Sequence, residues 1–151
     1  MKWNQERSIL LSKVCVSFFA ALLAFTDVCC RHLVGYLMDL SPVLGGLRDG
    51  VALMAVVYAC SVPGWITLAS LWQLLTRLGR GEVFTSFNVR AMRRTAWCCF
   101  AVAAVCLAGT WVYRPLLVIS AAAGFMGLIV RIVKNSFQLA AEMKDELDYT
   151  V

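Results

Sequence analysis

The chain has 151 residues and a net charge of +5, and it is 61% hydrophobic with only 15% charged residues. Soluble domains have about 25% charged residues, and a chain this short has too little interior to bury so much apolar surface. The composition therefore excludes an ordinary soluble domain. Because the basic residues stand at the ends of apolar runs, we attribute the charge to the lipid bilayer and expect no direct nucleic acid binding.

Four apolar runs, at about residues 9–30, 51–75, 95–113 and 115–133, are long enough to cross a bilayer as helices. The first run exceeds the apolar core of a signal peptide, about 7–15 residues, so we expect it to be retained. The sequence thus predicts an all-α membrane protein with a single four-helix transmembrane domain. Residues 134–151 are expected to form a cytoplasmic, amphipathic helical extension at its C-terminal end.

Asp27 is the only acidic residue inside an apolar run, and an ionisable group within a span is a candidate functional site. In the alternative interpretation it is partly hydrated near the interface, or pairs with Arg31 four residues on. Cys29, Cys30 and His32 follow directly. With one histidine in the chain, and adjacent cysteines that rarely both reach one ion, we expect no metal or cofactor. The seven irregularly spaced cysteines do not suggest a disulfide framework.

The segment 31–50 is too apolar for a freely solvated loop, so we expect a short element on the outer membrane face or over the mouth of the bundle. Ser41 and Pro42 are typical of a helix start. In the second run, Pro63 removes a backbone donor and predicts a kink. Broken helices mark binding sites in transporters, although a single kink is weak evidence for transport.

The most charged stretch lies between the second and third runs. Gly79 and Gly81 end the preceding helix, and Thr85 can cap a new helix that begins at Ser86. This connection carries one acidic residue, Glu82, and five arginines: Arg77, Arg80, Arg90, Arg93 and Arg94.

The third and fourth runs are joined by a short turn that contains Trp111, Tyr113 and Arg114, with Pro115 starting the next helix. This pattern predicts a tight helical hairpin with aromatic residues at its tip. The fourth run carries small residues at spacings of three and four, which allow close helix packing. We expect this face inside the bundle, although a homo-oligomer remains open; its residues are Ser120, Ala123, Gly124 and Gly127.

The C-terminal tail has an apolar stripe from Phe137 to Leu147 and is acidic, whereas the 77–94 connection is basic. We predict that the tail folds back beneath the bundle or docks a protein there, with packing by Phe137 outweighing single ion pairs. The alternative is a solvated helix that extends from the fourth span. The candidate docking residues are Arg80, Phe84, Phe87, Asn88, Arg93, Arg94, Phe137, Glu142, Asp145, Glu146 and Asp148.

The distribution of basic residues predicts the orientation, because lysine and arginine are kept in cytoplasmic segments. Three such residues lie at or before position 13, five lie in 77–94 and three lie in 131–144. Only Arg31, Arg48 and Arg114 lie on the other side. We therefore expect both termini in the cytoplasm.

Two stretches carry a resemblance: GEVFTSFN at 81–88 with the following Arg93 and Arg94, and the acidic ending from Lys134 to Val151. They resemble a family of small bacterial four-span membrane proteins catalogued as domain of unknown function 2975. The resemblance implies a multi-pass inner-membrane protein. Some members are encoded beside a small helix-turn-helix regulator, which implies a regulatory role, and no catalytic residues carry over. The many cysteines, and Tyr149 where leucine is commoner, depart from the family pattern.

These observations favour a non-enzymatic membrane protein that is a sensor or an anchor for a cytoplasmic regulatory partner. The alternative is a small transporter or permease subunit that uses Asp27 and the kink at Pro63. An enzyme would need a nucleophile, a base or a metal site, and the sequence does not assemble one.

Overall fold

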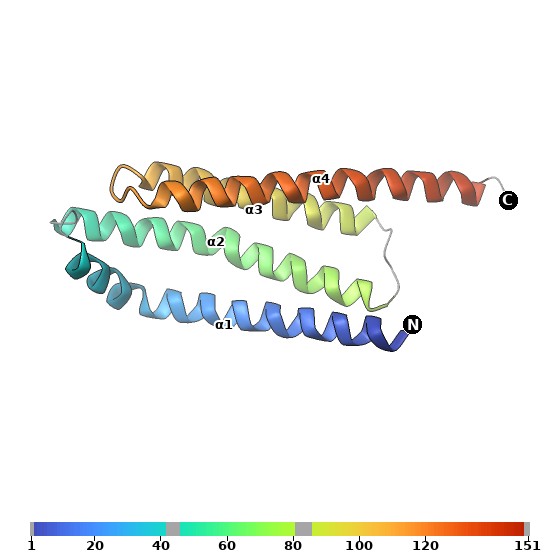
Figure 1. The fold of residues 1–151 in the computed structure, drawn as a ribbon, viewed down its shortest axis with the longest axis horizontal. Helices are drawn as coiled ribbons and strands as arrows, with labels where there is room; N and C mark the ends of the chain where they lie inside the picture. The colour runs from blue at the N-terminus through green and yellow to red at the C-terminus, as the bar shows by residue number, and fades with distance from the viewer. Residues whose placement is uncertain (1, 42–45, 81–85, 150–151) are drawn as a thin grey trace.

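The computed structural model describes residues 2–41, 46–80 and 86–149, and this part of the chain contains helices and no strand. The helices are α1 (Lys2–Leu40), α2 (Leu47–Leu78), α3 (Ser86–Gly109) and α4 (Leu116–Tyr149) (Figure 1). The predicted all-α fold with four spans is confirmed. By length and composition, each helix contains a segment that can cross a membrane: Arg7–Leu40, Leu47–Leu78, Phe87–Gly109 and Leu116–Ala140.

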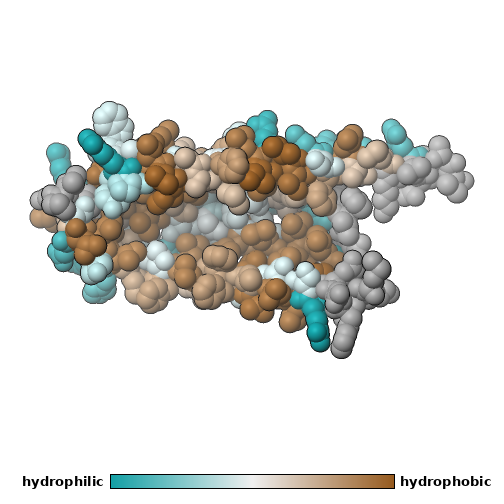
Figure 2. Space-filling model, in the orientation of Figure 1, coloured by the Kyte–Doolittle hydropathy of each residue, from teal (hydrophilic) through white to brown (hydrophobic). Residues whose placement is uncertain are grey.

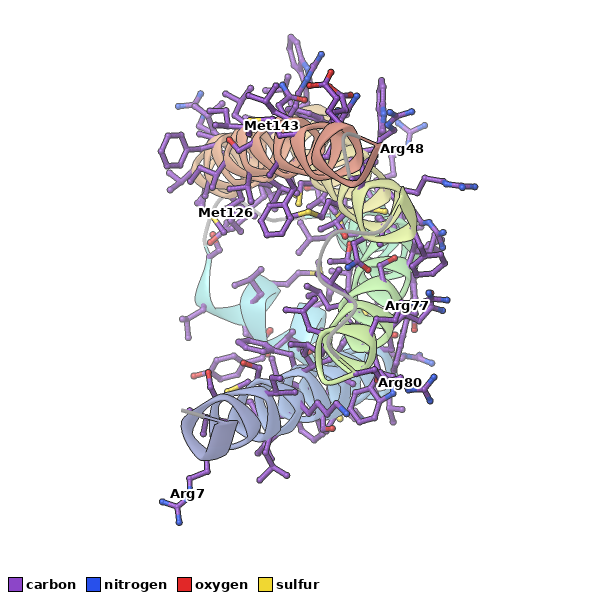
Figure 3. The ribbon with its side chains drawn as sticks, turned by 90° about the vertical axis from the view of Figure 1, so that its right-hand side faces the viewer. Arg7, Arg48, Arg77, Arg80, Met126 and Met143 are labelled. Carbon is purple, nitrogen blue, oxygen red and sulfur yellow. The ribbon has the colours of Figure 1, made fainter. Side chains whose placement is uncertain are left out.

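The four helices pack in chain order and leave one side of the bundle open. α1 lies against α2, α2 against α3 and α3 against α4, whereas the described backbones of α1 and α4 stay apart. Seen along the helices, the arrangement has the shape of a letter C with its gap between α1 and α4 (Figure 3). The bundle is therefore held together by three successive helix pairs.

The two ends of the bundle differ in charge. The start of α1 and the end of α4 lie at the same end, together with the end of α2 and the start of α3 (Figure 1). Arg31, Arg48 and Arg114 belong to the opposite end, which is formed by the last turns of α1, the first turns of α2 and the α3–α4 turn. The three segments that carry most of the lysine and arginine residues therefore lie at the same end of the bundle.

The segment after Cys30 is not the separate element that the sequence predicts. α1 continues without interruption to Leu40, and its last turns bend toward α2 (Figure 1). The reason is burial: Cys30, Val34 and Leu53 form the core of this end, with 0%, 2% and 4% of their surfaces exposed. Tyr113 of the α3–α4 turn also packs against this core. The helix start predicted at Pro42 lies outside the described residues.

The remaining boundaries follow the sequence more closely. Pro63 lies inside α2, which is helical from Leu47 to Leu78 and changes direction along its length in Figure 1. α3 begins at Ser86 as predicted, while its proposed cap, Thr85, lies outside the described residues. α3 ends at Gly109 rather than at the predicted Tyr113, because the turn begins there: the Val112 and Tyr113 amides donate to the Gly109 carbonyl at 3.0 Å.

Small residues bring α3 and α4 close together. A Cβ atom on Gly127 would lie 3.2 Å from both Cys99 Cβ and Phe100 Cε1, so a larger side chain would press against both residues. The Ser120 hydroxyl donates to the backbone carbonyl of Ala103 at 2.7 Å. The small-residue face predicted for the fourth run therefore packs inside the bundle, against α3.

Apolar side chains cover the outer surface of the helices. Phe18 and Phe25 of α1 are 62% and 69% exposed, and Val118 of α4 is 73% exposed. Figure 2 shows hydrophobic residues across the middle of the molecule and most hydrophilic residues toward its two ends. In water this surface would be strongly unfavourable, so it is the surface of a protein surrounded by lipid.

Candidate functional site

Asp27 of α1 accepts hydrogen bonds from two side chains of α2. The Trp65 indole Nε1 donates to one carboxylate oxygen at 3.0 Å, and the Ser61 hydroxyl donates to the other. The Tyr58 hydroxyl donates to the backbone carbonyl of Asp27 at 3.2 Å. Among the described residues there is no ion pair between Asp27 and Arg31, so the carboxylate bonds to a neighbouring helix instead of its own.

The three donors reach Asp27 because they share one face of α2. Tyr58, Ser61 and Trp65 are spaced by three and four residues, the spacing that aligns side chains along a helix. Ser61 is buried, with 7% of its surface exposed, and its hydroxyl also lies 3.1 Å from the Val57 carbonyl oxygen. Asp27 itself is half-buried. The polar group of α1 therefore meets a matching polar face on α2.

This arrangement can join two helices. An ionised carboxylate only accepts hydrogen bonds, so two side-chain donors match its two oxygens. Within a membrane, such contacts tie helices together, since an unpaired polar group in hydrocarbon is costly.

A cavity of about 410 Å³ begins next to this cluster and lies between the four helices. Its lining is almost entirely apolar and includes Thr26 of α1, Pro63 and Gly64 of α2, Cys99 of α3 and Ala123 of α4. Pro63 thus borders a cavity, as the transport hypothesis would require. The lining offers few groups that could bind a polar substrate.

The end of α2 and the start of α3 form a second cluster, which is basic and aromatic. The guanidinium carbon of Arg77 lies 3.9 Å from the centre of the Phe87 ring, a cation–π contact between the two helices. Lys13 of α1 places its Nζ atom 5.9 Å from the centre of the Trp72 ring. Trp72, Arg77, Phe87 and the exposed Arg80 also line a cavity of about 610 Å³.

The structure brings some of the predicted docking residues together and separates others. Phe87 and Arg80 line the same cavity, whereas Asn88 is buried in the bundle with 2% of its surface exposed. Arg93 and Arg94 are exposed on α3. Phe84 lies outside the described residues.

The acidic tail does not fold back in the part of the chain that the structure describes. α4 is one helix from Leu116 to Tyr149 and extends past the ends of the other helices (Figure 1). This matches the alternative of a helix that continues the fourth span, because the hydrogen-bonded backbone is unbroken. Glu142 and Glu146 are exposed on it, and the side chains of Asp145 and Asp148 lie outside the description. Docking of a protein on this helix remains a prediction.

The cysteine and histidine residues near the end of α1 differ in how far they are buried. Cys30 is fully buried and His32 is exposed, while Cys29 is half-buried. Within the described residues, no three His, Cys, Asp or Glu side chains come close enough to hold a metal ion. Cys60 and Cys106 lie close together instead, with their sulfur atoms 3.8 Å apart across α2 and α3.

Sequence reasoning missed the partners of Asp27. The sequence does place the side-chain donors Tyr58, Ser61 and Trp65 on one face of the second run, but it does not show which helix that face contacts. Sequence reasoning also missed the position of Trp72. It belongs to the second cluster and lies about two helical turns beyond Trp65 on the same face of α2. Both signals become visible only when the helices are paired, because each residue alone is ordinary for a span.

Four apolar helices with lipid-exposed surfaces, joined by polar contacts and by small residues, define a multi-pass α-helical membrane protein. A family model described as "Protein of unknown function (DUF2975)" matches residues 14–151. The chain belongs to this family, as the two resembling stretches imply. No curated protein and no solved structure matches the chain significantly.

Proposed function

We propose that this chain is a non-enzymatic membrane protein that acts as a sensor or as an anchor for a cytoplasmic regulatory protein. The observation that carries the proposal is the continuation of α4 past the other three helices (Figure 1). The apolar segment that can cross a membrane ends at Ala140, and the helix continues for nine residues to Tyr149. A projecting helix of this kind offers a surface to a protein outside the bilayer.

The projecting part of α4 keeps an apolar face. Met143 lies beyond Ala140 and is 52% exposed, and Leu139 on the same side of the helix is 59% exposed. Next to this face, the Gln138 amide donates to the Glu142 carboxylate at 3.2 Å. A helix with an apolar and a polar side buries the apolar one against a partner when one is present. The acidic residues beside it favour a partner with a basic surface.

We further propose that the end of the bundle that holds both termini faces the cytoplasm of a bacterium. Its support is the excess of lysine and arginine at that end over Arg31, Arg48 and Arg114 at the other. A reporter enzyme that is active only after export should be inactive when fused after Val151 and active when inserted in the α3–α4 turn. Strong activity of the fusion at Val151 would contradict this orientation.

The anchoring function is tested with a photoreactive amino acid at position 143 in the full chain, expressed in its native host. We expect a crosslink to one soluble protein with a DNA-binding or other regulatory domain, identified by mass spectrometry. Met143→Glu should release that protein from the membrane fraction and change transcript levels as deletion of the gene does. Gln138→Ala, on the opposite side of the helix, is the matched control and should do neither. Normal transcripts in both the deletion and the Met143→Glu strain would contradict the proposal.

Transport is the second candidate function, and the observation that favours it is the polar cluster at Asp27 beside a cavity bordered by Pro63. If Asp27 carries protons or a substrate, Asp27→Asn should abolish a proton- or substrate-dependent phenotype while the protein level in the membrane stays unchanged. An unchanged phenotype in that strain would leave Asp27 with its role between α1 and α2 alone.

A further inference from the structure

Two cavities follow one another along α2, and together we call them the seam. The first is the basic cavity of about 610 Å³, which is lined by α2 residues that include Arg77 and Arg80 and by Phe87 of α3. The second lies further into the span and is an apolar cavity of about 230 Å³ between α1 and α2. Trp72 lines both cavities, so the polar and the apolar part are adjacent.

The basic end of this seam gathers cations from two helices. Arg77 and Arg80 of α2 point to the same side of the bundle, away from its gap (Figure 3). Lys13 of α1 adds a third cation near Trp72, with its Nζ atom 5.9 Å from the centre of the ring. Gln73 adds a side-chain amide to the cavity wall, whereas the Thr76 hydroxyl donates to the Trp72 carbonyl of its own helix at 2.9 Å. Guanidinium groups with such neighbours are suited to a phosphate, because they donate several hydrogen bonds in a fixed plane.

The apolar part of the seam has small residues in its wall and a tryptophan from each of two turns of α2. It is lined by Val16, Ser17 and Ala20 of α1 and by Trp65, Leu68, Ala69 and Trp72 of α2. The small side chains leave a narrow space between the helices, and the tryptophans are 42% and 46% exposed, so the space is open to the surrounding lipid. A flexible hydrocarbon chain would fill such a space and bury the apolar surface of both helices.

We propose that the seam is a binding site for one anionic phospholipid, with its phosphate at Arg77, Arg80 and Lys13 and one acyl chain between Trp72 and Trp65. The length of the site supports this occupant. From Arg80 to Trp65 the helix advances fifteen residues, about 22 Å. One leaflet contributes about 15 Å of hydrocarbon, half of a core of about 30 Å, and the headgroup region adds the rest. The polar and apolar parts therefore have the order and the length of a lipid in one leaflet.

Charge sets the expected selectivity. Each basic residue at a membrane surface strengthens the attraction to anionic lipid, and aromatic residues such as Trp72 sit at the level of the headgroups. A zwitterionic lipid with the same acyl chains would fill the apolar part, but its headgroup would gain less binding free energy from the arginines. Inorganic phosphate would bind at the arginines but would gain no binding free energy from the apolar part of the seam.

The test uses the full chain, purified and stripped of lipid in a neutral detergent. Its thermal unfolding is measured with phosphatidylglycerol, with phosphatidylcholine of identical acyl chains, and with inorganic phosphate. We expect phosphatidylglycerol at about 100 times its Kd to raise the Tm by about 5 °C and the other two to give smaller shifts. An equal shift with phosphatidylcholine would overturn the proposal. An equal shift with inorganic phosphate would show a free-phosphate site and overturn the role of the groove.

Two variants separate the two parts of the site. Arg77→Gln with Arg80→Gln should weaken the binding of phosphatidylglycerol about thirtyfold, measured as retained lipid by native mass spectrometry. Arg48→Gln with Arg114→Gln, at the opposite end of the bundle, is the matched control and should retain the lipid.

Ala69→Leu should fill the apolar groove and weaken lipid binding, while any shift with inorganic phosphate stays unchanged. Its near-ultraviolet circular dichroism checks that the variant is folded. Should Ala69→Leu fail to fold, Ser17→Val fills the same groove from α1 and replaces it. Unchanged lipid retention in the arginine pair variant, or in the folded groove variant, would overturn the proposed position of the lipid.

Discussion

The first and the last helix pair of this protein are held together in different ways. α1 meets α2 through the carboxylate of Asp27 and the side chains of Ser61 and Trp65. α3 meets α4 through close contact, because Gly127 leaves no room for a side chain next to Cys99. The first pair is joined by hydrogen bonds between polar side chains, and the second pair by close packing of the two helices at a small residue.

The difference explains where the cavities are. The apolar cavity of about 230 Å³ lies between α1 and α2, and the cavity of about 410 Å³ is lined by residues of all four helices. Small residues allow backbones to approach closely, and polar side chains form hydrogen bonds across helices. Helices in lipid have no hydrophobic drive toward each other, so the kind of contact decides the spacing. The α1–α2 pair is consequently the pair with room for a lipid.

The largest expected effect comes from closing the space between α3 and α4. Gly127→Leu should destabilise the protein by about 3 kcal/mol, because the new side chain forces Cys99 and Phe100 apart. Unfolding by SDS titration in mixed micelles measures the change. Gly35→Leu on α1 is the matched control, since nothing lies within 4 Å of the added Cβ atom there. It should leave stability unchanged or slightly raised. Equal effects of the two substitutions would show that α3 and α4 do not depend on close contact.

A smaller effect is expected from the polar contact between α1 and α2. In a double-mutant cycle of Asp27→Ala and Trp65→Phe, the coupling free energy should be about 1 kcal/mol, within the range for hydrogen bonds between membrane helices. The cycle removes the separate cost of placing a carboxylate in lipid, which a single substitution would include.

The matched control for this cycle pairs Asp27→Ala with Trp97→Phe on α3. Trp97 is 70% exposed and belongs to a helix that makes no backbone contact with α1 in the described residues. Its coupling to Asp27 should be zero within error. A coupling as large as that of Trp65 would mean that the cycle reports a general change in the micelle and not the contact.

The sequence was sufficient for the features that depend on local pattern. The four spans follow from the length of the apolar runs, and the hairpin follows from the short turn around Tyr113. The small-residue face of α4, with Ser120 and Gly127, was found by its spacing, and its burial against α3 confirms the prediction.

The features that depend on contacts between distant residues could not be predicted. Ser61 and Trp65 lie 34 and 38 residues from Asp27, and nothing in the sequence pairs them. The neighbour four residues on, Arg31, was the only local candidate and is not the partner. The length of α1 was missed for the same reason: Val34 continues the helix because Leu53 and the α3–α4 turn cover it.

The smallest expected effect concerns the hydroxyl of Ser120, and it distinguishes close contact from hydrogen bonding in the α3–α4 pair. This hydroxyl donates to the Ala103 carbonyl of the neighbouring helix, whereas the exposed Ser136 donates to Ile132 of its own helix at 3.2 Å. Ser120→Ala should destabilise by about 0.6 kcal/mol, the average for hydrogen bonds between membrane helices, and Ser136→Ala by less. Both are measured by the same SDS titration. If Ser120→Ala cost as much as Gly127→Leu, the hairpin would depend on its hydrogen bond, and the distinction between the two helix pairs would fail. A small cost leaves backbone approach as the main source of its stability, because alanine keeps the small size that the contact requires.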